Sequence, residues 1–211
     1  MSYAIIRNVK YKRGNLGLAY RHNERENKNY SNKDIDLERL YLNYHLKEPI
    51  LSYEKEFDKL KKENDYKGQI KAVSNIACEY VITSSKEFFD EIGEEETRRY
   101  FETACEFVSN YKNLGEKNIL SAVVHMDETT PHMHLIFVPV VHTIDKKGRE
   151  IDKIACSEFW KSKDSYRQLQ DAFHKYMVSH DFMLERRNSL DREHYTIKEY
   201  KELTNYENNC H

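Results

Sequence analysis

The segment HMDETTPHMHL, residues 125–135, carries five side chains that could do chemistry within ten positions: His125, Asp127, Glu128, His132 and His134. Neutral imidazoles bind first-row metal ions, and a site with three of them leaves coordination positions open for water or substrate. The pattern differs from the H-E-x-x-H helix of zinc peptidases. The segment therefore predicts a three-histidine metal site, and the alternative is a strand surface that merely happens to be rich in histidine.

The histidines can meet only if the surrounding chain forms a hairpin with one particular register. Successive residues of a strand point to opposite faces, so His132 and His134 lie side by side. His125 joins them if its cross-strand partner is His132 or His134 rather than Met133, because direct partners share a face. We expect Met126 and Met133 to point to the other face, into the core.

Hydrophobic periodicity and turn residues indicate which elements position this hairpin. The runs 118–127 and 132–141 are the most apolar and predict adjacent antiparallel strands at the centre of a sheet. The other expected elements are strands at 3–11 and 78–85, a short strand or irregular segment at 40–46, and helices at 15–26, 52–66, 86–113 with a break near Gly93, 162–180 and 196–206, with a loop at 142–152. This order predicts an α+β fold with an antiparallel-centred β-sheet flanked by helices.

Composition and charge limit the classes of protein to which this sequence can belong. The 211 residues suit one domain, no uncharged apolar run approaches the length of a membrane span, and the N-terminus has no signal-peptide pattern, so we expect a cytoplasmic protein. The four cysteines are scattered, which predicts free thiols. The net charge is −2, yet residues 1–33 hold eight bases against two acids. That basic end would suit a polyanion, and an ordinary solvated surface explains it equally well.

Three motifs together resemble the Mob/Pre plasmid relaxases, the MobV class of HUH single-strand endonucleases. HMDETTPHMHL resembles that family's H-x-D-E-x-x-P-H-x-H motif. HNERENKNYSNKDID, residues 22–36, resembles its N-terminal motif, and LNYHL, residues 42–46, resembles its short N-Y-x-L motif. The motifs occur in the family's order and near its spacing, and the resemblance covers residues 1–190. It implies a relaxase domain over 1–190 with an HUH endonuclease-like sandwich.

The resemblance implies an enzyme that nicks one DNA strand at a plasmid's origin of transfer, stays covalently attached to the 5' phosphate, and later rejoins the strand. His125, His132 and His134 would hold one divalent metal ion, Mn²⁺ or Mg²⁺ in the first place and Zn²⁺ as the alternative. His22 would be the nucleophile and form a phosphoramidate. Glu128 would orient or deprotonate His22, and Arg25 would steady the phosphate or the imidazole. Without the motif, a lone helical histidine such as His22 is usually just a surface residue.

Other residues are expected to contact DNA. Tyr44 competes with His22 as nucleophile because most HUH enzymes use tyrosine; we assign Asn43 and Tyr44 to DNA contact or to support of the site. Aromatic residues interleaved with bases suit stacking on single-stranded nucleobases and phosphate contact, although ordinary packing explains any one tyrosine as well. The remaining expected DNA contacts are Lys10, Lys12, Arg13, Tyr30 and Asn32.

The implied partners are plasmid DNA at the origin of transfer, with a single-stranded nick region beside a hairpin or duplex, and the conjugation coupling machinery. A homodimer would form through a C-terminal region that relaxases of this class usually have; residues 191–211 would be a helical tail that starts a missing or shortened version of it. The alternative functions are a rolling-circle replication initiator or transposase of the HUH class, and a non-catalytic DNA-binding repressor with a structural metal.

Overall fold

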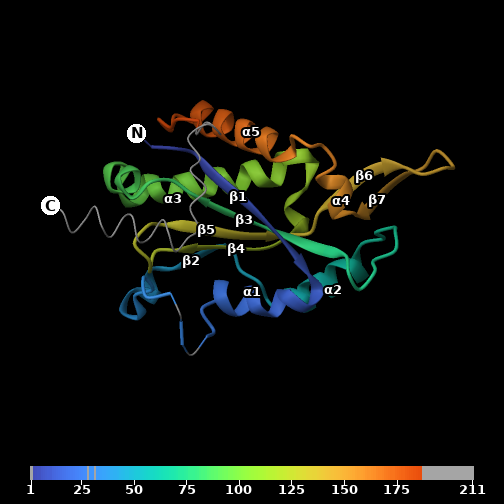
Figure 1. Cartoon of the computed structure of the whole chain (residues 1–211), viewed down its shortest axis with the longest axis horizontal. Helices are drawn as coiled ribbons and strands as arrows, with labels where there is room; N and C mark the ends of the chain where they lie inside the picture. Colours follow the sequence, from blue (N-terminus) through green and yellow to red (C-terminus); the bar gives the residue numbers. More distant parts are fainter. Residues whose placement is uncertain (1, 28, 31, 187–211) are drawn as a thin grey trace.

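The structure is a computed structural model that describes residues 2–27, 29–30 and 32–186 (Figure 1). In this part of the chain, five strands form one antiparallel sheet in the order β1-β3-β5-β4-β2. The strands are β1 (Ile5–Lys12), β2 (Tyr44–Lys47), β3 (Asn75–Thr83), β4 (Ile119–His125) and β5 (His132–Phe137). The expected α+β fold with an antiparallel central sheet is confirmed, and β5 is the middle strand. The expected tail helix at 196–206 lies outside the described residues.

Helices cover both faces of the sheet, as Figure 1 shows. One face packs against α3 (Lys86–Asn110) and α5 (Ser165–Ser179), and the other against α1 (Leu16–Asn23) and α2 (Tyr53–Glu63). Strand alternation divides the side chains of β5 between two apolar cores. Met133 belongs to the core under α3 and α5, whereas Ile136 belongs to the core under α1 and α2. His132 and His134 therefore share the face of Ile136, on the side that α1 covers.

Helix α3 agrees with its sequence signals, whereas α1 ends earlier than predicted. Ser85 caps α3, because its hydroxyl accepts a hydrogen bond from the backbone N–H of Phe88. The expected break of this helix is present at Gly93, whose φ of 78° lies in the left-handed region that glycine tolerates. Helix α1 is shorter than predicted and ends at Asn23, and Arg25 follows with a positive φ of 55°. That turn lies directly after the helix that carries His22.

The segment after β5 corrects two predictions. The single strand expected at 132–141 is interrupted, because Pro139 lacks an N–H for the ladder and the chain leaves the sheet there. The segment expected as a loop forms a two-stranded hairpin instead, with β6 (Val140–Ile144) and β7 (Glu150–Ile154). Asp145 stabilises its turn by accepting hydrogen bonds from the backbone N–H groups of Lys147 and Arg149. A short helix, α4 (Cys156–Phe159), follows.

Candidate active site

The three histidines of HMDETTPHMHL meet on one face of the β4–β5 hairpin. His125 pairs directly with His132, and His134 lies two residues further along the same face, so the predicted register is confirmed. The ring centroids are 5.2 Å apart for His125 and His132, 4.8 Å for His125 and His134, and 5.0 Å for His132 and His134. Their ligand nitrogens all lie within 4.8 Å of one another. Met133 points to the other face and is fully buried, as expected.

Backbone carbonyls orient two of the imidazoles. His125 Nε2 lies 2.7 Å from the carbonyl oxygen of Asn23, and His132 Nδ1 lies 2.9 Å from that of Thr130. A carbonyl can only accept, so these ring nitrogens carry the protons and the opposite nitrogens keep their lone pairs. Burial lowers the pKa of His125, and it lowers that of His132 to about 4, so both rings are neutral at neutral pH.

A buried carboxylate orients the third imidazole. His134 Nδ1 lies 2.8 Å from Oε1 of Glu79, a β3 residue that is only 3% exposed. Within the described residues, His125 Nδ1 and His134 Nε2 are buried and have no hydrogen-bond partner. Buried nitrogens with lone pairs and no donor are the groups that a metal ion satisfies. The donor set therefore fits one divalent ion held by His125, His132 and His134.

His22 stands beside this cluster, at the C-terminal end of α1. Leu16, Ala19 and Asn23 form the buried stripe of that helix and hold its end against the sheet. The ring centroid of His22 lies 5.3 Å from that of His134 and 6.2 Å from that of His125. Burial, assisted by the neighbouring His134 and Arg25, lowers the pKa of His22. The structure thus places a neutral imidazole next to the three candidate ligands.

Arg25 ties the N-terminal motif to the histidine motif. Its Nε and Nη2 donate to the two carboxylate oxygens of Asp127 at 2.8 and 2.9 Å, and Nη2 also donates to Glu128 Oε1 at 2.7 Å. The other oxygen of Glu128 accepts from Asn32 Nδ2 at 2.8 Å, while Oε1 lies 3.8 Å from His132 Nε2. Glu128 therefore lies between Arg25 and the candidate metal ligand His132, and its action on His22 stays a prediction.

Besides Asn32, two of the expected DNA-contact residues lie at this site in supporting positions. Asn43 Oδ1 accepts hydrogen bonds from the backbone N–H groups of Met126 and Asp127, at 2.7 and 3.1 Å, and so holds the loop after β4. Tyr30 lies under Arg25, whose guanidinium carbon is 5.7 Å from its ring centroid. Their contact with DNA stays a prediction.

Tyr44 lies on the opposite face of the sheet from the histidines. Its cross-strand partner is Val124, which belongs to the core under α3 and α5, and the guanidinium of Arg98 lies 4.7 Å from its ring centroid. Its hydroxyl is buried and has no hydrogen-bond partner among the described residues. The sheet thus separates this hydroxyl from the three histidines. This placement argues against Tyr44 as the nucleophile of this site, and its assignment to DNA contact or to support of the site stays a prediction.

The basic residues at the end of β1 are not brought to the cluster. Lys10 has Cys78 as its cross-strand partner, and its ammonium lies 5.6 Å from the ring centroid of Tyr166 on α5. Arg13 forms a bidentate ion pair with Asp58 of α2. Lys12 is exposed. Their role in DNA binding stays a prediction, and any contact they make lies away from the histidines.

The residues that sequence reasoning missed are Glu79, Asn23 and Asp127 as partners of the functional side chains. Glu79 carried a signal, because an acid within the apolar strand CEYVIT needs a buried partner. That partner, His134, is 55 positions away, so only the strand pairing identifies it.

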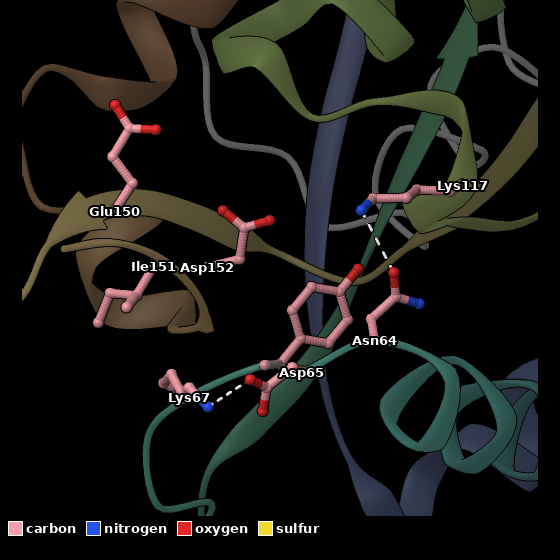
Figure 2. A pocket seen from close by; sticks show the side chains of 8 residues that line it. Asn64, Asp65, Lys67, Lys117, Glu150, Ile151 and Asp152 are labelled. Atoms are coloured by element: carbon pink, nitrogen blue, oxygen red, sulfur yellow. Dashed lines mark hydrogen bonds and ion pairs between the residues drawn. The ribbon is translucent and has the colours of Figure 1, made fainter.

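A surface pocket elsewhere on the molecule is shown in Figure 2. It lies between the segment after α2 and the β6–β7 hairpin. Lys117 donates to Asn64 Oδ1 at 3.2 Å, and Lys67 pairs with Asp65 at 2.5 Å (Figure 2). The lining is Asn64, Asp65, Tyr66, Lys67, Lys117, Glu150, Ile151 and Asp152. It contains none of the expected catalytic or metal-binding residues, so we place the chemistry at the histidine cluster.

Comparison with solved structures finds the same fold in a DNA-processing domain. The MobM relaxase domain (MOBV; Mob_Pre), solved with bound Mn and with origin-of-transfer (oriT) DNA of plasmid pMV158, is 36% identical to this chain. It aligns with a TM-score of 0.79 over 95% of this chain and 98% of that domain. A second structure of that domain, with 26 nucleotides of the same DNA, gives a TM-score of 0.70 at 32% identity, over 94% of this chain and 99% of that domain.

Curated relatives agree with the structural match. A plasmid recombination enzyme of Streptococcus agalactiae is 38% identical over 95% of this chain and 39% of its own length. A type 1 plasmid recombination enzyme of Staphylococcus aureus is 37% identical over 97% of this chain and 50% of its own length. The chain thus spans half or less of these two relatives. Among the described residues, no helix has the length and apolar character that crossing a membrane requires.

The family model described as plasmid recombination enzyme, Mob_Pre, matches residues 1–202, which include all three motifs and every residue of the site. This chain therefore belongs to the Mob_Pre family of plasmid recombination enzymes.

Proposed function

We propose that this chain is the nicking and joining domain of a plasmid relaxase, which cleaves one strand of DNA at an origin of transfer and keeps the 5' phosphate on His22. The observation that carries the proposal is the position of His22 beside three histidines, two of which have a buried nitrogen with no hydrogen-bond partner in the part of the chain that the structure describes. Family membership and the DNA-bound MobM relaxase domain support the choice of DNA as substrate.

His125, His132 and His134 would hold one divalent ion. Mn²⁺ is favoured because the related relaxase domain contains it, and Mg²⁺ and Zn²⁺ are the alternatives. When bound, such an ion supplies a Lewis acid that polarises the phosphate oxygens. Nucleophilic attack, proton transfer and positioning of the phosphate would come from the chain's own residues. The neutral rings of His125 and His132 need lose no proton before they bind a cation.

His22 would attack the scissile phosphate with the lone pair of one ring nitrogen. An N–P bond forms and the bond from phosphorus to the 3' oxygen breaks, which gives a phosphoramidate on the 5' side. The ring then releases the proton of its other nitrogen, and the 3' oxygen takes up one proton to become a hydroxyl, so no net proton is gained or lost. The reverse reaction, with a 3' hydroxyl as nucleophile, rejoins the strand.

Glu128 and Arg25 would assist this exchange. Glu128 is the carboxylate proposed to orient His22 or take its proton. Arg25 would steady the phosphate, and it already positions Glu128 through the 2.7 Å hydrogen bond between them. The backbone carbonyl of His22 also accepts from Arg25 Nη1 at 3.3 Å, which ties the guanidinium to the attacking residue.

The DNA would be the single-stranded nick region with its adjacent hairpin or duplex. Near the histidines, Tyr30 and Asn32 would make stacking or polar contacts with the DNA. Lys12 and the basic residues next to it in the sequence would contact phosphates further from the site. Contact with the coupling machinery and a homodimer remain predictions for the whole protein.

A nicking assay tests the proposal. Supercoiled plasmid carrying the cognate origin of transfer is incubated with the chain and Mn²⁺, Mg²⁺ or Zn²⁺, and the relaxed product is quantified. We expect strand-specific nicking that His22→Ala abolishes. Nicking of replication-origin DNA in preference would identify a rolling-circle initiator instead. Binding without nicking under every metal, unaffected by changes to the three histidines, would identify a repressor.

A further inference from the structure

Glu79 is a carboxylate in the middle of the sheet that the mechanism above does not use. Its residue is 3% exposed, on the face that α1 covers. A buried carboxylate is costly unless hydrogen bonds compensate for the lost water. Three do so: Tyr11 donates to Oε2 at 2.6 Å, and His134 Nδ1 and Asn23 Nδ2 approach Oε1 at 2.8 and 2.9 Å.

The bond to His134 selects the tautomer that can bind a metal. With its proton on Nδ1 and directed at Glu79, the ring keeps the lone pair on Nε2, the buried nitrogen without a partner among the described residues. A carboxylate behind a metal-binding imidazole fixes the plane of the ring and makes it a stronger donor. The negative charge also offsets part of the charge that a divalent ion brings into a buried site.

The bond to Asn23 extends this effect to a second ligand. The side chain of Asn23 donates to Glu79, while its backbone carbonyl accepts the proton of His125 Nε2. Asn23 is 1% exposed and is the last residue of α1, directly after His22. The Glu79 carboxylate therefore contacts His134, a candidate ligand in β5. It also contacts Asn23 at the end of α1, which holds His125 in β4 and directly follows His22, the proposed nucleophile.

We propose that Glu79 is a positioning residue of the active site, which orients His134 directly and His125 through Asn23, and which couples metal binding to the position of α1 and His22. This inference rests on the proposed function, because it concerns the same metal site. A purely structural role for the network is the competing explanation. A structural role predicts that changing Glu79 lowers the stability of the fold. Any drop in metal affinity would then be no larger than the drop in stability explains.

Tyr11→Phe is the matched control for Glu79→Gln. The Tyr11 hydroxyl contacts Oε2, the oxygen that faces away from His134 and Asn23, so its removal weakens the same buried carboxylate and leaves the bonds to the ligand and to α1 in place. Isothermal titration calorimetry with Mn²⁺, without DNA, measures affinity. Thermal unfolding of the metal-free chains measures stability separately.

We expect Glu79→Gln to weaken Mn²⁺ binding by about 10- to 100-fold, the range for lost partners of ligating histidines. Tyr11→Phe should bind Mn²⁺ nearly as the wild type does, whatever its melting temperature. Equal affinity of Glu79→Gln and wild type would overturn the proposal, and so would equal losses in the two variants.

Hydrogen–deuterium exchange tests the coupling to α1. In the wild type we expect Mn²⁺ to slow exchange of the amides in residues 16–24, and in Glu79→Gln we expect this protection to disappear. Should Glu79→Gln fail to fold, Asn23→Ala removes the amide bond but keeps the carbonyl, and it should lose the Mn²⁺-dependent protection as well. Undiminished protection in the folded variants would refute the coupling. Mn²⁺ binding by a wild-type chain that nicks no DNA would refute the proposed function and leave the role of Glu79 standing.

Discussion

Arg25 and Asp127, 102 positions apart in the chain, are joined by two hydrogen bonds of 2.8 and 2.9 Å between a guanidinium that is 8% exposed and a carboxylate that is fully buried. This pair fixes the turn after α1, the helix that carries His22, to the loop after β4, the strand that ends at His125. The N-terminal motif and the histidine motif are thus held together by a buried ion pair as well as by the sheet.

Breaking this pair should destabilise the fold strongly. Asp127→Asn leaves the buried guanidinium without one of its two carboxylates, and loss of a buried partner costs about 3–5 kcal/mol. We expect the free energy of unfolding, measured in urea, to fall by about 3 kcal/mol, because Glu128 still compensates in part. The matched control is Asp58→Asn, which breaks the half-exposed pair with Arg13 and should cost less than about 1 kcal/mol. Equal losses in the two variants would show that the buried pair has no special role.

Tyr44→Phe should leave nicking unchanged. The hydroxyl is buried without a partner in the described chain and lies on the far face of the sheet, so its removal takes no group from the active site. Stability should stay the same or rise by up to about 1 kcal/mol, because an unsatisfied buried hydroxyl is removed. A relaxation assay and urea unfolding check both statements. A large loss of nicking in a stably folded Tyr44→Phe would return tyrosine to consideration as the nucleophile.

The contact of His45 with Glu24 should make stability depend on pH. His45 Nε2 lies 2.7 Å from Glu24, and this hydrogen bond raises the pKa of His45 above its ordinary 6.5. The protonated histidine is therefore stabilised by folding. Its contribution is fully present below pH 6.5 and is lost as the pH rises through the higher, folded-state pKa. Burial opposes ionisation of Glu24, yet hydrogen bonds from His45 and Tyr53 lower its pKa below 4.5, so the carboxylate is charged throughout that range.

His45→Gln provides the measurement, since it keeps a polar side chain without the titration. The unfolding free energy of the wild type minus that of His45→Gln should be larger near pH 6 than near pH 8.5, as the linkage requires. A difference that is constant across this range, or that grows with pH, would contradict the assigned ion pair.

Divalent metal should stabilise the chain through the three histidines. A ligand at about 100 times its Kd adds about 2.7 kcal/mol to the free energy of unfolding, so Mn²⁺ should raise Tm and EDTA should reverse the rise. His132→Ala should abolish the shift, because it removes one of the three ligands. His142→Ala is the control, since His142 lies in the β6–β7 hairpin, where it contacts Asp152. A Tm shift that survives in His132→Ala would place the metal elsewhere.

The site was predictable where periodicity determines it and unpredictable where long-range packing does. The alternation of side chains along a strand is enough to place His132 and His134 on one face, with Met133 on the other. It also determines which register brings His125 to the same face. The face on which Tyr44 lies depends on how the chain passes from the 3-10 helix Leu37–Leu42 into β2 at the edge of the sheet, which local sequence pattern does not encode. The partners of Glu79 are set by strand order.

The β6–β7 hairpin shows the same limit at the level of the fold. Its residues 142–152 are mostly polar and contain a glycine turn, so composition favours a loop. Pairing of Val140 with Ile154 and of Ile144 with Glu150 nevertheless closes two strands, because the chain leaves the main sheet at Pro139 and turns back on itself. Tertiary packing, rather than local composition, therefore determines that this segment forms the β6–β7 hairpin.

Mapping the covalent adduct shows directly whether His22 is the residue that carries the DNA. The chain is incubated with Mn²⁺ and an oligonucleotide that spans the cognate nick site, the adduct is digested, and the modified peptide is sequenced by mass spectrometry. We expect a 5' phosphate on His22, labile in acid as a phosphoramidate is, and absent from His22→Ala but retained in Tyr44→Phe. An acid-stable adduct on a tyrosine, or an adduct that persists in His22→Ala, would show that His22 is not the nucleophile.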